Sequence, residues 1–441
     1  MRRVAPAVMW FRRDLRLADN PALLDAAAAG DGQLIGLFVL DPLLWDEDEE
    51  ADARRDRLVA SLRSLSDSMG GKLVVRRGDP AEVVPALAKE IGAVSVHVAA
   101  DYGPYGQRRD RAVEEALDCP LIATGSPYAV APGRVLTQQG SSYQVFTPYF
   151  RAWLEHGWRQ PVDPPARVEW IGRWSDALPS ASPVDGAGEG AARQHWQDYL
   201  DGVAAYDDER DRPDLDSTSR MSIPLKYGEI HPRTMLADLA RQRSAGAEAY
   251  RRELAWREFC GDLLARHPEA AWKPLRPEFE KLAYDEPGDS FDAWCNGLTG
   301  YPIVDAGMRQ LAQSGFMHNR VRMVVASFLV KDLHVHWKHG AKWFMRKLQD
   351  GDLASNSLNW QWVAGCGADA SPYFRIFNPT TQGLKFDPAG DYVRRWIPAL
   401  ANLPGRAAHE PWKHSAEGYP ARIVDHAEAR QEALRRYDAL R

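Results

Sequence analysis

The amino-acid sequence predicts an α/β N-terminal domain with a doubly wound, Rossmann-like parallel sheet, followed by an all-α domain. Three observations predict this fold class. Short, nearly continuous apolar runs alternate with helical segments over residues 1–130, which is the pattern of a parallel sheet covered by helices. Residues 131–195 are rich in proline and lack a regular period, which indicates a connection between domains. From residue 196 to 441 the strand signal disappears, and a helical period of apolar residues dominates.

Turn and cap residues bound the elements expected in the first domain. Asn20 precedes Pro21 as a helix cap, Asp41-Pro42 ends a strand, and Asp79-Pro80 starts another helix. The expected strands are residues 4–11, 34–40, 72–76, 94–98 and 121–123, and the expected helices are 22–29, 54–69, 80–90 and 108–117. Ligands of such sheets bind beyond the carboxyl ends of the strands, where Asp41 and Asp101 lie. No Gly-x-Gly-x-x-Gly follows the first strand and no Walker loop is present, so a dinucleotide site there is disfavoured.

The second domain should consist of helices only. The expected helices are residues 192–206, 231–242, 247–267, 290–295, 303–314, 320–334 and 343–348. A further helix should begin near Pro224, after the hydroxyl-rich segment Thr218–Ser222. Hydroxyl and amide groups at a helix start suit an anion such as phosphate, although serine and threonine also cap helices without any ligand. Both interpretations stay open on this segment alone.

Composition places the chain among globular proteins of the cytoplasm. The 441 residues suffice for two or three domains, and no apolar run is long enough to span a bilayer. The N-terminus becomes charged too early for a secretory signal, and the four cysteines are scattered, so neither a disulfide framework nor a metal site is expected. The net charge of −6 argues weakly against a polyanionic partner, but a local basic groove can lie on an acidic protein. We therefore expect a cytoplasmic monomer that needs no membrane and no obligate protein partner.

The stretch from Asp350 to Trp362 has an unusual composition. It combines two acids, amides and two tryptophans, in a part of the chain that holds most of the 16 tryptophans. Large aromatic rings stack on flat ligands, while acids and amides bind ligand edges. A buried, tryptophan-rich helix with a solvated acidic cap would have the same composition. The stretch alone does not separate the two.

Six motifs, in the same order along the chain as in a known family, favour the ligand-binding interpretation of this stretch. They are Glu253–Phe259, Thr299–Asp305, Met317–Arg320, Asp350–Asn356, Asn359–Trp362 and Arg375–Pro379. Together with Trp10–Leu17 they resemble the photolyase/cryptochrome family over nearly the whole chain. Within that family the sequence is most similar to the class I cyclobutane pyrimidine dimer (CPD) DNA photolyases. The resemblance implies an enzyme, a carbon–carbon lyase, that repairs UV-damaged DNA in blue light by electron transfer from excited reduced FAD to a flipped-out dimer. It also implies an antenna-binding domain at 1–130, the connection at 131–195 and a helical FAD-binding catalytic domain at 196–441.

The resemblance assigns two sets of side chains to FAD. The diphosphate set is Tyr206, Thr218, Ser219, Arg220, Met221 and Ser222. The remaining set is Tyr250, Asn319, Arg322, Asp350, Gly351 and Asp352, with the catalytic Asn356 at flavin N5. Arg322 and Asp350 can pair beside the flavin, where a cation favours an anionic reduced ring. The amide of Asn356 can turn between donor and acceptor, which suits a cofactor that changes its redox state.

The lesion site follows from one helix face. Glu253 and Trp256 are three residues apart, so they share a face that offers a wall for a base and a group for its carbonyl edge. The resemblance adds Trp362 as the second wall, with Asn319, Arg320, Met323, Gln382 and Lys385 as further contacts to the lesion or the DNA. Arg394 and Arg395 are weaker candidates, because they suit solvated surface equally well. Glu253 must hold or share a proton. The alternative is that Glu253 pairs with an arginine of its own helix, namely Arg251, Arg252 or Arg257.

Photoreduction in this family uses a chain of aromatic residues. Trp360 and Trp337 match its inner and middle members, whereas Tyr284 stands where the outer member is usually tryptophan. Tyrosine loses a proton when it is oxidised, so we expect slower or pH-dependent photoreduction, unless Trp294 replaces it. A second chromophore, the antenna, is expected at Phe38 and Asp101. The loop after Asp101 is similar to that of members that bind 8-hydroxy-5-deazaflavin, with methenyltetrahydrofolate as the alternative.

Four other functions compete with CPD repair. A signalling cryptochrome commonly loses the Glu253/Trp256 pair or adds a long tail. A photolyase for the 6-4 photoproduct is associated with paired histidines, where this chain has a single one, His318, before Asn319. A DASH-type cryptochrome usually carries tyrosine at the position of Trp256. A flavin oxidoreductase without photochemistry would require a nicotinamide site, which the sequence does not offer.

Overall fold

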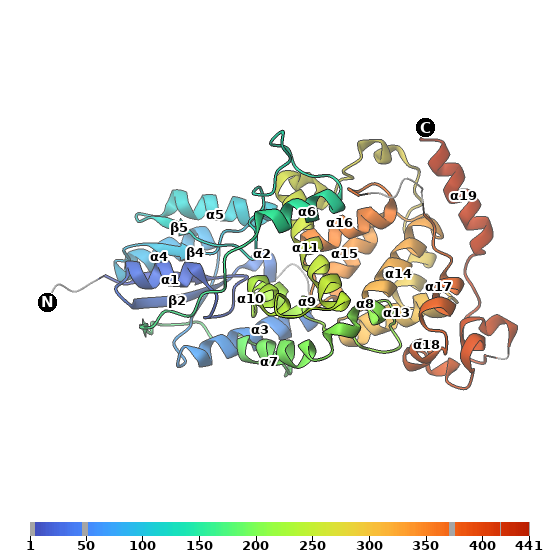
Figure 1. The fold of residues 1–441 in the computed structure, drawn as a ribbon, viewed down its shortest axis with the longest axis horizontal. Coiled ribbons are helices and arrows are strands. Elements are labelled where there is room, and N and C mark those ends of the chain that lie inside the picture. Colours follow the sequence, from blue (N-terminus) through green and yellow to red (C-terminus); the bar gives the residue numbers. More distant parts are fainter. Residues whose placement is uncertain (1–4, 46–51, 370–374, 415, 441) are drawn as a thin grey trace. The chain divides into compact units, whose positions relative to one another are not determined.

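The computed structural model describes residues 5–45, 52–369, 375–414 and 416–440. The chain divides into two compact units. The first consists of Met1–Ala204 and Ser219–Pro268, and the second of Ala205–Thr218 and Glu269–Arg441. Each unit has its own elements, which Figure 1 labels along the chain.

The first unit contains the predicted doubly wound parallel sheet. Its main strands are β1 Ala7–Phe11, β2 Gln33–Leu40, β3 Val74–Arg77, β4 Val96–Val98 and β5 Leu121–Ala123, in the order β3-β2-β1-β4-β5 (Figure 1). All pairs between them are parallel. The prediction of the fold class is therefore confirmed. A short strand that the sequence analysis missed, β6 Glu169–Trp170, adds to the edge of β2 through two residue pairs.

Helices cover both faces of this sheet. They are α1 Pro21–Ala29, α2 Pro42–Trp45, α3 Asp52–Ser68, α4 Pro80–Ile91 and α5 Pro104–Ala116. Apolar residues of α1 and α3 pack on one face, and those of α4 and α5 pack on the other. The predicted caps hold, because Asn20 accepts from the amide of Leu23 and Asp79 from that of Ala81. The carboxyl ends of the strands thus meet at one edge of the sheet.

The first unit also contains five helices beyond the sheet. They are α6 Phe146–His156, α7 Glu189–Leu200, α9 Ser222–Tyr227, α10 Pro232–Leu239 and α11 Ala245–Arg266. The segment 131–195 was predicted to be a connection without regular elements, which is wrong for α6 and β6. The helix α6 buries Phe146, Tyr149, Phe150 and Trp153. These residues lie at helical spacing, so the sequence carried the signal.

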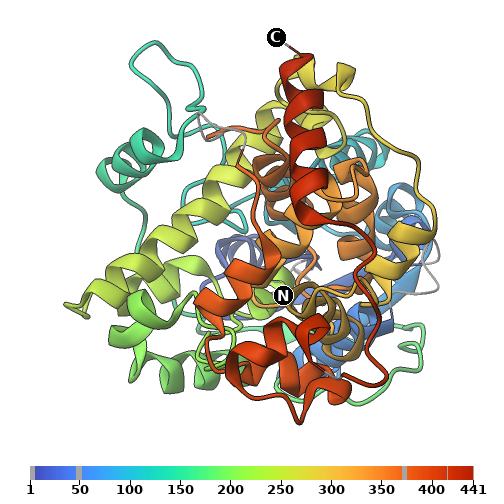
Figure 2. The same ribbon diagram turned by 90° about the vertical axis from the view of Figure 1, so that its right-hand side faces the viewer.

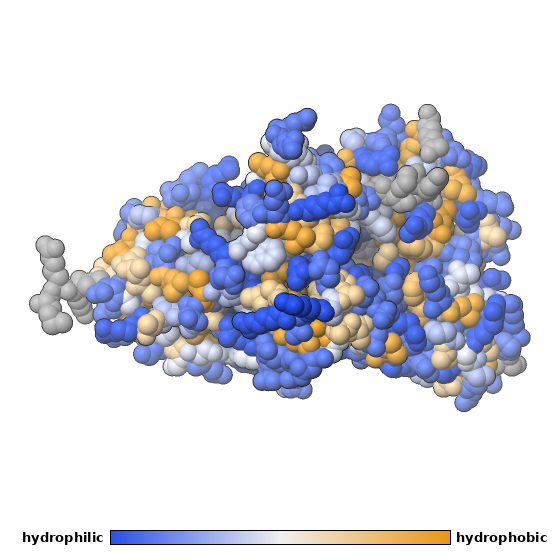
Figure 3. All heavy atoms as spheres, in the orientation of Figure 1, coloured by the Kyte–Doolittle hydropathy of each residue, from blue (hydrophilic) through white to orange (hydrophobic). Residues whose placement is uncertain are grey.

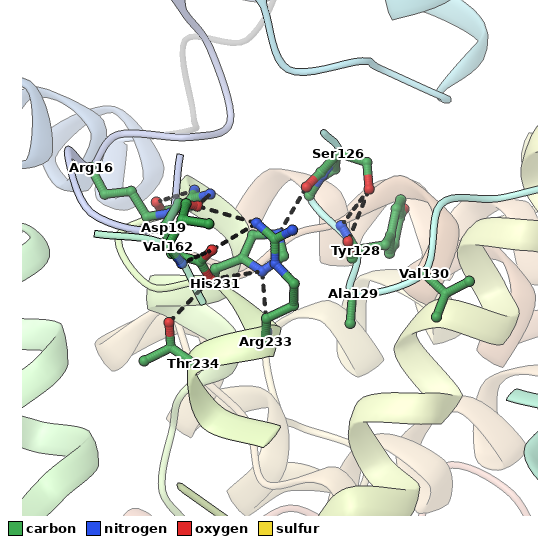
Figure 4. Close-up of polar contacts among 12 residues, drawn as sticks. Arg16, Asp19, Ser126, Tyr128, Ala129, Val130, Val162, His231, Arg233 and Thr234 are labelled. Carbon is green, nitrogen blue, oxygen red and sulfur yellow. Dashed lines mark hydrogen bonds and ion pairs between the residues drawn. The ribbon is translucent and has the colours of Figure 1, made fainter. Parts of the chain in front are cut away.

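A buried ionic cluster holds the start of α10 (Figure 4). Asp19, which adopts a positive φ of 49°, accepts hydrogen bonds from Arg233 at 2.7 Å and Thr234 at 3.2 Å. His231 caps α10 by accepting from the amide of Arg233, while its Nε2 donates to the carbonyl of Ser126 at 2.9 Å. Burial lowers the pKa of His231 far below its usual value, and the nearby Arg16 and Arg233 add to this effect. The histidine is therefore a neutral, fixed part of the scaffold.

Among the described residues, the second unit has only helices and one isolated bridge, between Asp285 and Val335. Its helices are α8 Tyr206–Glu209, α12 Asp289–Cys295, α13 Pro302–Ser314, α14 Asn319–Lys331, α15 Trp337–Lys347, α16 Leu353–Ala364, α17 Pro379–Phe386, α18 Asp391–Trp396 and α19 His426–Asp438. Short 3-10 turns occur at Val203–Ala205, Pro268–Ala271, Pro277–Lys281, Pro398–Leu400, Gly405–His409 and Pro411–Lys413. One apolar core contains buried residues from six helices, namely α12, α13, α14, α15, α16 and α18. The all-α prediction is confirmed for this part of the chain.

The start of α15 deviates from the prediction. The helix α15 begins at Trp337, six residues before the predicted start, because the ring of His336 caps it by accepting from the amide of Lys338. His231 and His318 cap α10 and α14 in the same way. Histidine is not among the preferred N-cap residues, so the start of α15 was missed. The helices α10 and α14 begin within one residue of the predicted starts at 231 and 320.

The surface is ordinary for a globular protein. Figure 3 shows hydrophilic side chains over most of the face in view, with apolar residues in small groups between them. Within the described ranges, no helix has both the length and the apolar content needed to cross a membrane.

Candidate functional site

The predicted lesion residues of the first unit lie on α11, a helix of 22 residues. Glu253 and Trp256 are both half-buried. The indole of Trp256 stacks face to face on Phe146 of α6, with ring centroids 3.7 Å apart and planes at 9°. One face of the indole is therefore covered by a fixed ring, and the side chain still reaches solvent. Phe146 is a candidate functional residue that sequence reasoning missed.

Polar contacts hold α6 against α11 behind this stack. Glu258 accepts from the indole nitrogen of Trp153 at 2.6 Å and from the amides of Ala129 and Val130. Burial raises the pKa of Glu258, although these hydrogen bonds oppose the shift. The guanidinium of Arg252 lies over the rings of Phe146 and Phe150, at 5.5 and 4.9 Å from their centroids. The stacking partner of Trp256 is thus fixed from both ends of α6.

The three arginines that offered an alternative partner for Glu253 are engaged elsewhere. Arg251 binds Glu248, and Arg252 covers the phenylalanine rings described above. Arg257 donates to the carbonyl of Pro127 at 2.8 Å and lies over the ring of Tyr128.

The predicted diphosphate segment is ordered by local hydrogen bonds in the first unit. The Tyr250 hydroxyl lies 2.6 Å from Ser219 Oγ, which also accepts from the amide of Met221 at 3.3 Å. Arg220 adopts a positive φ of 51°, a left-handed conformation that few non-glycine residues take up. Ser222 opens α9. Such strain in a predicted phosphate-binding segment favours a functional role.

In the second unit, Arg322 and Asp350 form the predicted ion pair, with 2.9 Å between Nη2 and Oδ2. Arg322 Nε also donates to the carbonyl of Met317 at 2.7 Å, which fixes the guanidinium. The second oxygen of Asp350, Oδ1, is buried and has no hydrogen-bond partner in the described part of the chain. An acceptor in that state is costly unless a ligand donates to it.

Two further buried oxygens share this state. Within the described ranges, neither Ser217 Oγ nor Thr218 Oγ1 has a hydrogen-bond partner. Ser217 was not predicted, although it directly precedes the predicted Thr218. Tyr206 lies on the same unit, with its ring 5.4 Å from the guanidinium carbon of Arg210. Unpartnered hydroxyl and carboxylate oxygens among the predicted cofactor residues fit a polar ligand such as FAD.

The residues of the tryptophan-rich stretch lie on and before α16. Asp352 caps this helix by accepting from the amide of Ser355 at 3.0 Å, which gives it a structural role. Asn356 is buried, and its Nδ2 donates to the carbonyl of Ala341 at 2.9 Å. This bond opposes the predicted rotation of the amide and leaves Oδ1 as the free end. Gly351 lies in the turn just before the helix.

The remaining lesion and DNA candidates of the second unit differ in exposure. Asn319 and Lys385 are exposed, whereas Met323 and Trp362 are half-buried at the edge of the core. Gln382 Oε1 is buried and has no hydrogen-bond partner among the described residues. Arg320 already pairs with Asp211 at 2.6 Å, so a phosphate would have to compete with this carboxylate.

The weaker phosphate candidates are engaged as well. Arg394 pairs with Asp391 and also donates to two carbonyl groups. Arg395 donates to the carbonyl of Asp214 at 3.3 Å. Arg394 must therefore change partners to bind a phosphate, whereas the exposed Arg395 has further N–H groups for one.

Trp360 and Trp337, the predicted inner members of the relay, both lie in the core of the second unit. Trp360 is buried against Phe344 and Trp294, with centroids 5.0 and 6.2 Å away. A Cβ at position 340 would lie 2.1 Å from Trp360 Cη2, so glycine is needed where α15 crosses α16. Trp337 is also buried.

The ring of His336 lies between Trp337 and Tyr284. Its centroid is 5.6 Å from that of Trp337 and 4.5 Å from that of Tyr284. Burial raises the pKa of the Tyr284 phenol well above its usual value, and the side chain is half-buried. Trp294 is fully buried, with its indole nitrogen bonded to the carbonyl of Val325. Sequence reasoning missed His336.

The antenna candidates of the first unit have structural contacts. Phe38 is part of the core between the sheet, α1 and α3. Asp101 accepts from the amide of Gly103 at 3.0 Å and pairs with Arg109. Burial would raise the pKa of Asp101, but Arg13, Arg109 and Arg12 outweigh it and lower the pKa. A Cβ at Gly106 would lie 2.2 Å from Asp101 Cγ, so the first turn of α5 requires glycine at that position.

Metal and thiol chemistry have no candidate centre in the described ranges. No group of three or more His, Cys, Asp or Glu side chains there is arranged to hold a metal ion. The four cysteines are free thiols.

Comparison with known proteins gives one consistent result. Residues 7–167 match the family model described as DNA photolyase, and residues 250–439 match the one described as FAD binding domain of DNA photolyase. The deoxyribodipyrimidine photo-lyase of Streptomyces griseus is 42% identical over 96% of this chain and 97% of its own length.

Two solved structures are similar over almost the entire chain. A class III photolyase from Agrobacterium tumefaciens superposes with a TM-score of 0.91 at 38% identity, covering 99% of this chain and 98% of that chain. An archaeal photolyase from Sulfolobus tokodaii, solved with two FAD molecules, superposes with a TM-score of 0.85 at 28% identity, covering 98% of this chain and 100% of that chain. The chain therefore belongs to the photolyase/cryptochrome family, with an N-terminal photolyase domain and a helical FAD-binding domain.

Proposed function

We propose that this protein is a deoxyribodipyrimidine photo-lyase, which uses blue light and FAD to split cyclobutane pyrimidine dimers in DNA. The observation that carries the proposal is the pair Glu253 and Trp256 on one face of α11, with the indole stacked on Phe146. A signalling cryptochrome commonly lacks this pair, and a DASH-type protein usually has tyrosine in place of Trp256. The name of the Streptomyces griseus relative supports the same activity.

The lesion residues have distinct roles under this proposal. Trp256 offers a flat, apolar wall for one base of the extruded dimer, because Phe146 holds its ring in place. Trp362 is the second wall and Met323 a neighbouring apolar contact. Glu253 in its protonated form donates to a base carbonyl and so stabilises the negative charge that develops on the dimer. Asn319 and Gln382 supply polar contacts.

Phosphate binding falls to Arg320 and Lys385 in the proposal. Lys385 is exposed, with its ammonium group 4.9 Å from the ring of Phe386. Arg320 lies over the same ring at 4.4 Å and must exchange Asp211 for a phosphate. These cations form a local basic site on a chain whose net charge is −6.

FAD fits the unpartnered polar atoms of the predicted cofactor residues. When bound and reduced, it supplies the electron that light makes available. The diphosphate is assigned to Tyr206 and to residues 218–222, where Thr218 Oγ1 is free to donate. Asp350 Oδ1 accepts from a cofactor N–H, while Arg322 places a positive charge nearby. Asn356 presents Oδ1 to the cofactor, because Nδ2 is held by Ala341. Tyr250, Gly351 and Asp352 complete the assignment, the last as the cap of α16.

A photoreduction relay through Trp360, Trp337 and Tyr284 is part of the proposal. Tyr284 is favoured over Trp294 as the outer member, because Trp294 is fully buried. Half-buried Tyr284 reaches solvent and contacts His336 beside Trp337.

The test compares substrates and variants. Purified protein with chemically reduced FAD is irradiated with DNA that carries either a CPD or a 6-4 photoproduct. We expect repair of the CPD only, with Glu253→Gln lowering kcat about tenfold or more and Trp256→Ala raising KM, since each removes a different contact. Glu248→Gln, which removes a surface partner of Arg251, is the matched control on the same helix. Repair of the 6-4 photoproduct, or Glu253→Gln with the parent kcat, contradicts the assignment.

The antenna is proposed to be 8-hydroxy-5-deazaflavin, bound near Phe38 and Asp101. Three arginines keep Asp101 ionised, which gives the loop a fixed negative charge at the carboxyl end of β4. Methenyltetrahydrofolate is the alternative, and the Sulfolobus tokodaii structure with its second FAD adds a third chromophore class. Extraction and absorption spectra separate them: a band in the visible blue that is not due to flavin supports deazaflavin, while a band confined to the near ultraviolet supports folate.

The cellular setting is proposed with the same activity. The free cysteines suit a reducing cytoplasm. A monomer is proposed as the active form, with 1–130, 131–195 and 196–441 as functional segments for antenna, connection and FAD. Light scattering at working concentration tests the monomer.

A further inference from the structure

The C-terminal helix α19 contacts the chain on both sides of Tyr284. Arg436 Nη1 donates to the carbonyl of Ala283 at 3.2 Å and to Asp285 Oδ1 at 2.9 Å. Its Nη2 donates to Asp285 Oδ2 at 3.3 Å. In Figures 1 and 2 the red C-terminal helix lies beside the yellow segment that contains these residues. One guanidinium therefore fixes both neighbours of Tyr284.

Arg436 is held in place before it reaches this loop. Glu432, one turn earlier on α19, accepts from Arg436 Nε at 2.7 Å. The helix itself is anchored at its first residue by the hydrogen bond between His426 Nδ1 and Asp332 Oδ1. Near its end, Tyr437 packs on Phe279, with ring centroids 6.0 Å apart. The position of the guanidinium is thus set by the helix and not by the loop.

The opposite side of the loop is bound to the segment that precedes α15. The amide of Asp285 donates to the carbonyl of His334 at 2.9 Å, in the bridge between Asp285 and Val335. The next residue, His336, places its ring 4.5 Å from that of Tyr284 and 5.6 Å from that of Trp337. Tyr284 is therefore clamped between Arg436 on one side and the ring that leads to Trp337 on the other.

His336 serves as a spacer and does not take up a proton. Its Nδ1 accepts from the amide of Lys338 at 3.1 Å, so this nitrogen carries no hydrogen and Nε2 does. Burial, with Lys338 and His339 nearby, lowers the pKa of His336 to about 4, so the ring stays neutral. A phenolic proton released from Tyr284 must therefore pass to solvent, to which the half-buried side chain has access.

We propose that Arg436 is a positioning residue for photoreduction, which fixes Tyr284 at the distance and angle from His336 and Trp337 that electron transfer requires. In that step, oxidised Trp337 gains one electron from Tyr284, and Tyr284 releases its phenolic proton to water. A thiol reductant in solution later returns the electron, and water returns the proton. The inference rests on the proposed relay through Tyr284. Transfer between two fixed groups depends steeply on their geometry, so loss of the clamp should slow it without affecting repair by protein that is already reduced.

The experiment uses the full-length, FAD-loaded protein. Arg436→Ala is compared with Arg435→Ala, which removes the neighbouring arginine. Among the described residues, the Arg435 side chain binds Glu432 and no other partner. Arg436→Lys restores the charge as a rescue variant. Three quantities are measured: hydrogen exchange of the backbone around Asp285, the rate of flavin photoreduction with a thiol, and the yield of tyrosyl radical by electron paramagnetic resonance.

The proposal predicts a specific combination of results. In Arg436→Ala the backbone amide hydrogens around Asp285 exchange faster, the flavin is photoreduced at least fivefold more slowly, and less tyrosyl radical forms. The FAD content and the repair activity after dithionite reduction equal those of the parent. Arg435→Ala matches the parent in all three quantities, and Arg436→Lys recovers part of the rate. Photoreduction of Arg436→Ala within twofold of the parent overturns the positioning role.

A third variant separates this failure from a failure of the relay. If Tyr284→Phe is photoreduced at the parent rate, Tyr284 is not part of the relay, and Arg436 then has no role in photoreduction. If Tyr284→Phe slows photoreduction but Arg436→Ala does not, the relay through Tyr284 stands and only the positioning role of Arg436 is overturned.

Discussion

Phe146 of α6 and Trp256 of α11 stack face to face, with centroids 3.7 Å apart and ring planes at 9°. The pair joins a helix from the segment expected to be irregular to the helix that carries Glu253. Because one face of the indole is covered, Trp256 meets its substrate as a fixed wall. Preorganisation of this kind lowers the cost of binding a flat ligand.

Shortening Phe146 to leucine should loosen this wall. We expect Phe146→Leu to raise KM for CPD-containing DNA roughly two- to tenfold with a smaller change in kcat, which corresponds to the energy of one aromatic pair. Steady-state repair by protein with pre-reduced FAD measures both constants. Phe150→Leu is the matched control, because Phe150 contacts Phe146 and Arg252 but has no ring contact with Trp256 in the described structure. Equal KM values for the two variants contradict the role of the stack.

The ion pair between Arg322 and Asp350 should be required for FAD retention. Asp350→Asn keeps the shape but leaves the half-buried guanidinium without its counter-charge, at a cost on the order of 3 kcal/mol. We expect a lower melting temperature and less flavin per protein, both measured on freshly purified material. Asp391→Asn, which disrupts the exposed pair with Arg394, serves as the control and should change neither. Full flavin content in Asp350→Asn argues against this aspartate as a cofactor residue.

Gly340 should be irreplaceable where α15 crosses α16. A Cβ at this position meets Trp360 Cη2 at 2.1 Å and Leu329 Cδ2 at 2.6 Å, both inside the core. We expect Gly340→Ala to reduce the unfolding free energy by about 1–3 kcal/mol, the usual cost of overpacking. Urea denaturation measures the change. Gly288→Ala has open space around its Cβ and should stay close to the parent. A Gly340→Ala protein as stable as the parent shows that the two helices can separate without cost.

Lys331 should make stability depend on pH. It is buried, and burial lowers its pKa to about 7, although Cys366 and Asp332 oppose the shift. An unfolded lysine has a pKa of about 10.4, so between pH 7 and 10 the unfolded chain binds more protons than the folded one. Stability from this group therefore rises with pH across that window, by at most about 1.4 kcal/mol per unit, and is constant below it.

A substitution isolates this contribution. The unfolding free energy of Lys331→Met, measured with urea at pH 6, 7.5 and 9, should fall relative to the parent as the pH increases. The exposed Lys385→Met should instead keep the pH dependence of the parent. Parallel curves for the parent and Lys331→Met refute the shifted pKa.

The fold was largely accessible from the sequence. β1 and β2 carry long apolar runs, and Asn20 and Asp79 cap helices in the usual way. The misses have physical causes. The helix α15 begins at a histidine cap, His336, and histidine is not among the residues expected at a helix start. β6 has only two residues, and the helical period of α6 lies in a proline-rich segment.

The resemblance proposes the residues of the candidate site, but the sequence does not indicate how they pack. The pairing expected of Arg322 and Asp350 is present. The stack of Phe146 on Trp256 joins residues 110 positions apart, so no local pattern reveals it. For the same reason the sequence gives no sign that Arg320 pairs with Asp211, or that Arg436 holds the neighbours of Tyr284.

A photolyase repairs a CPD in blue light and not in the dark. Purified protein with reduced FAD is mixed with an oligonucleotide that contains one CPD, and half of the sample is kept in the dark. We expect restored thymines only in the sample under blue light, with a large loss in Glu253→Gln and little change in Glu248→Gln. Repair in the dark, or no repair under light when FAD is bound and reduced, would contradict the proposed activity.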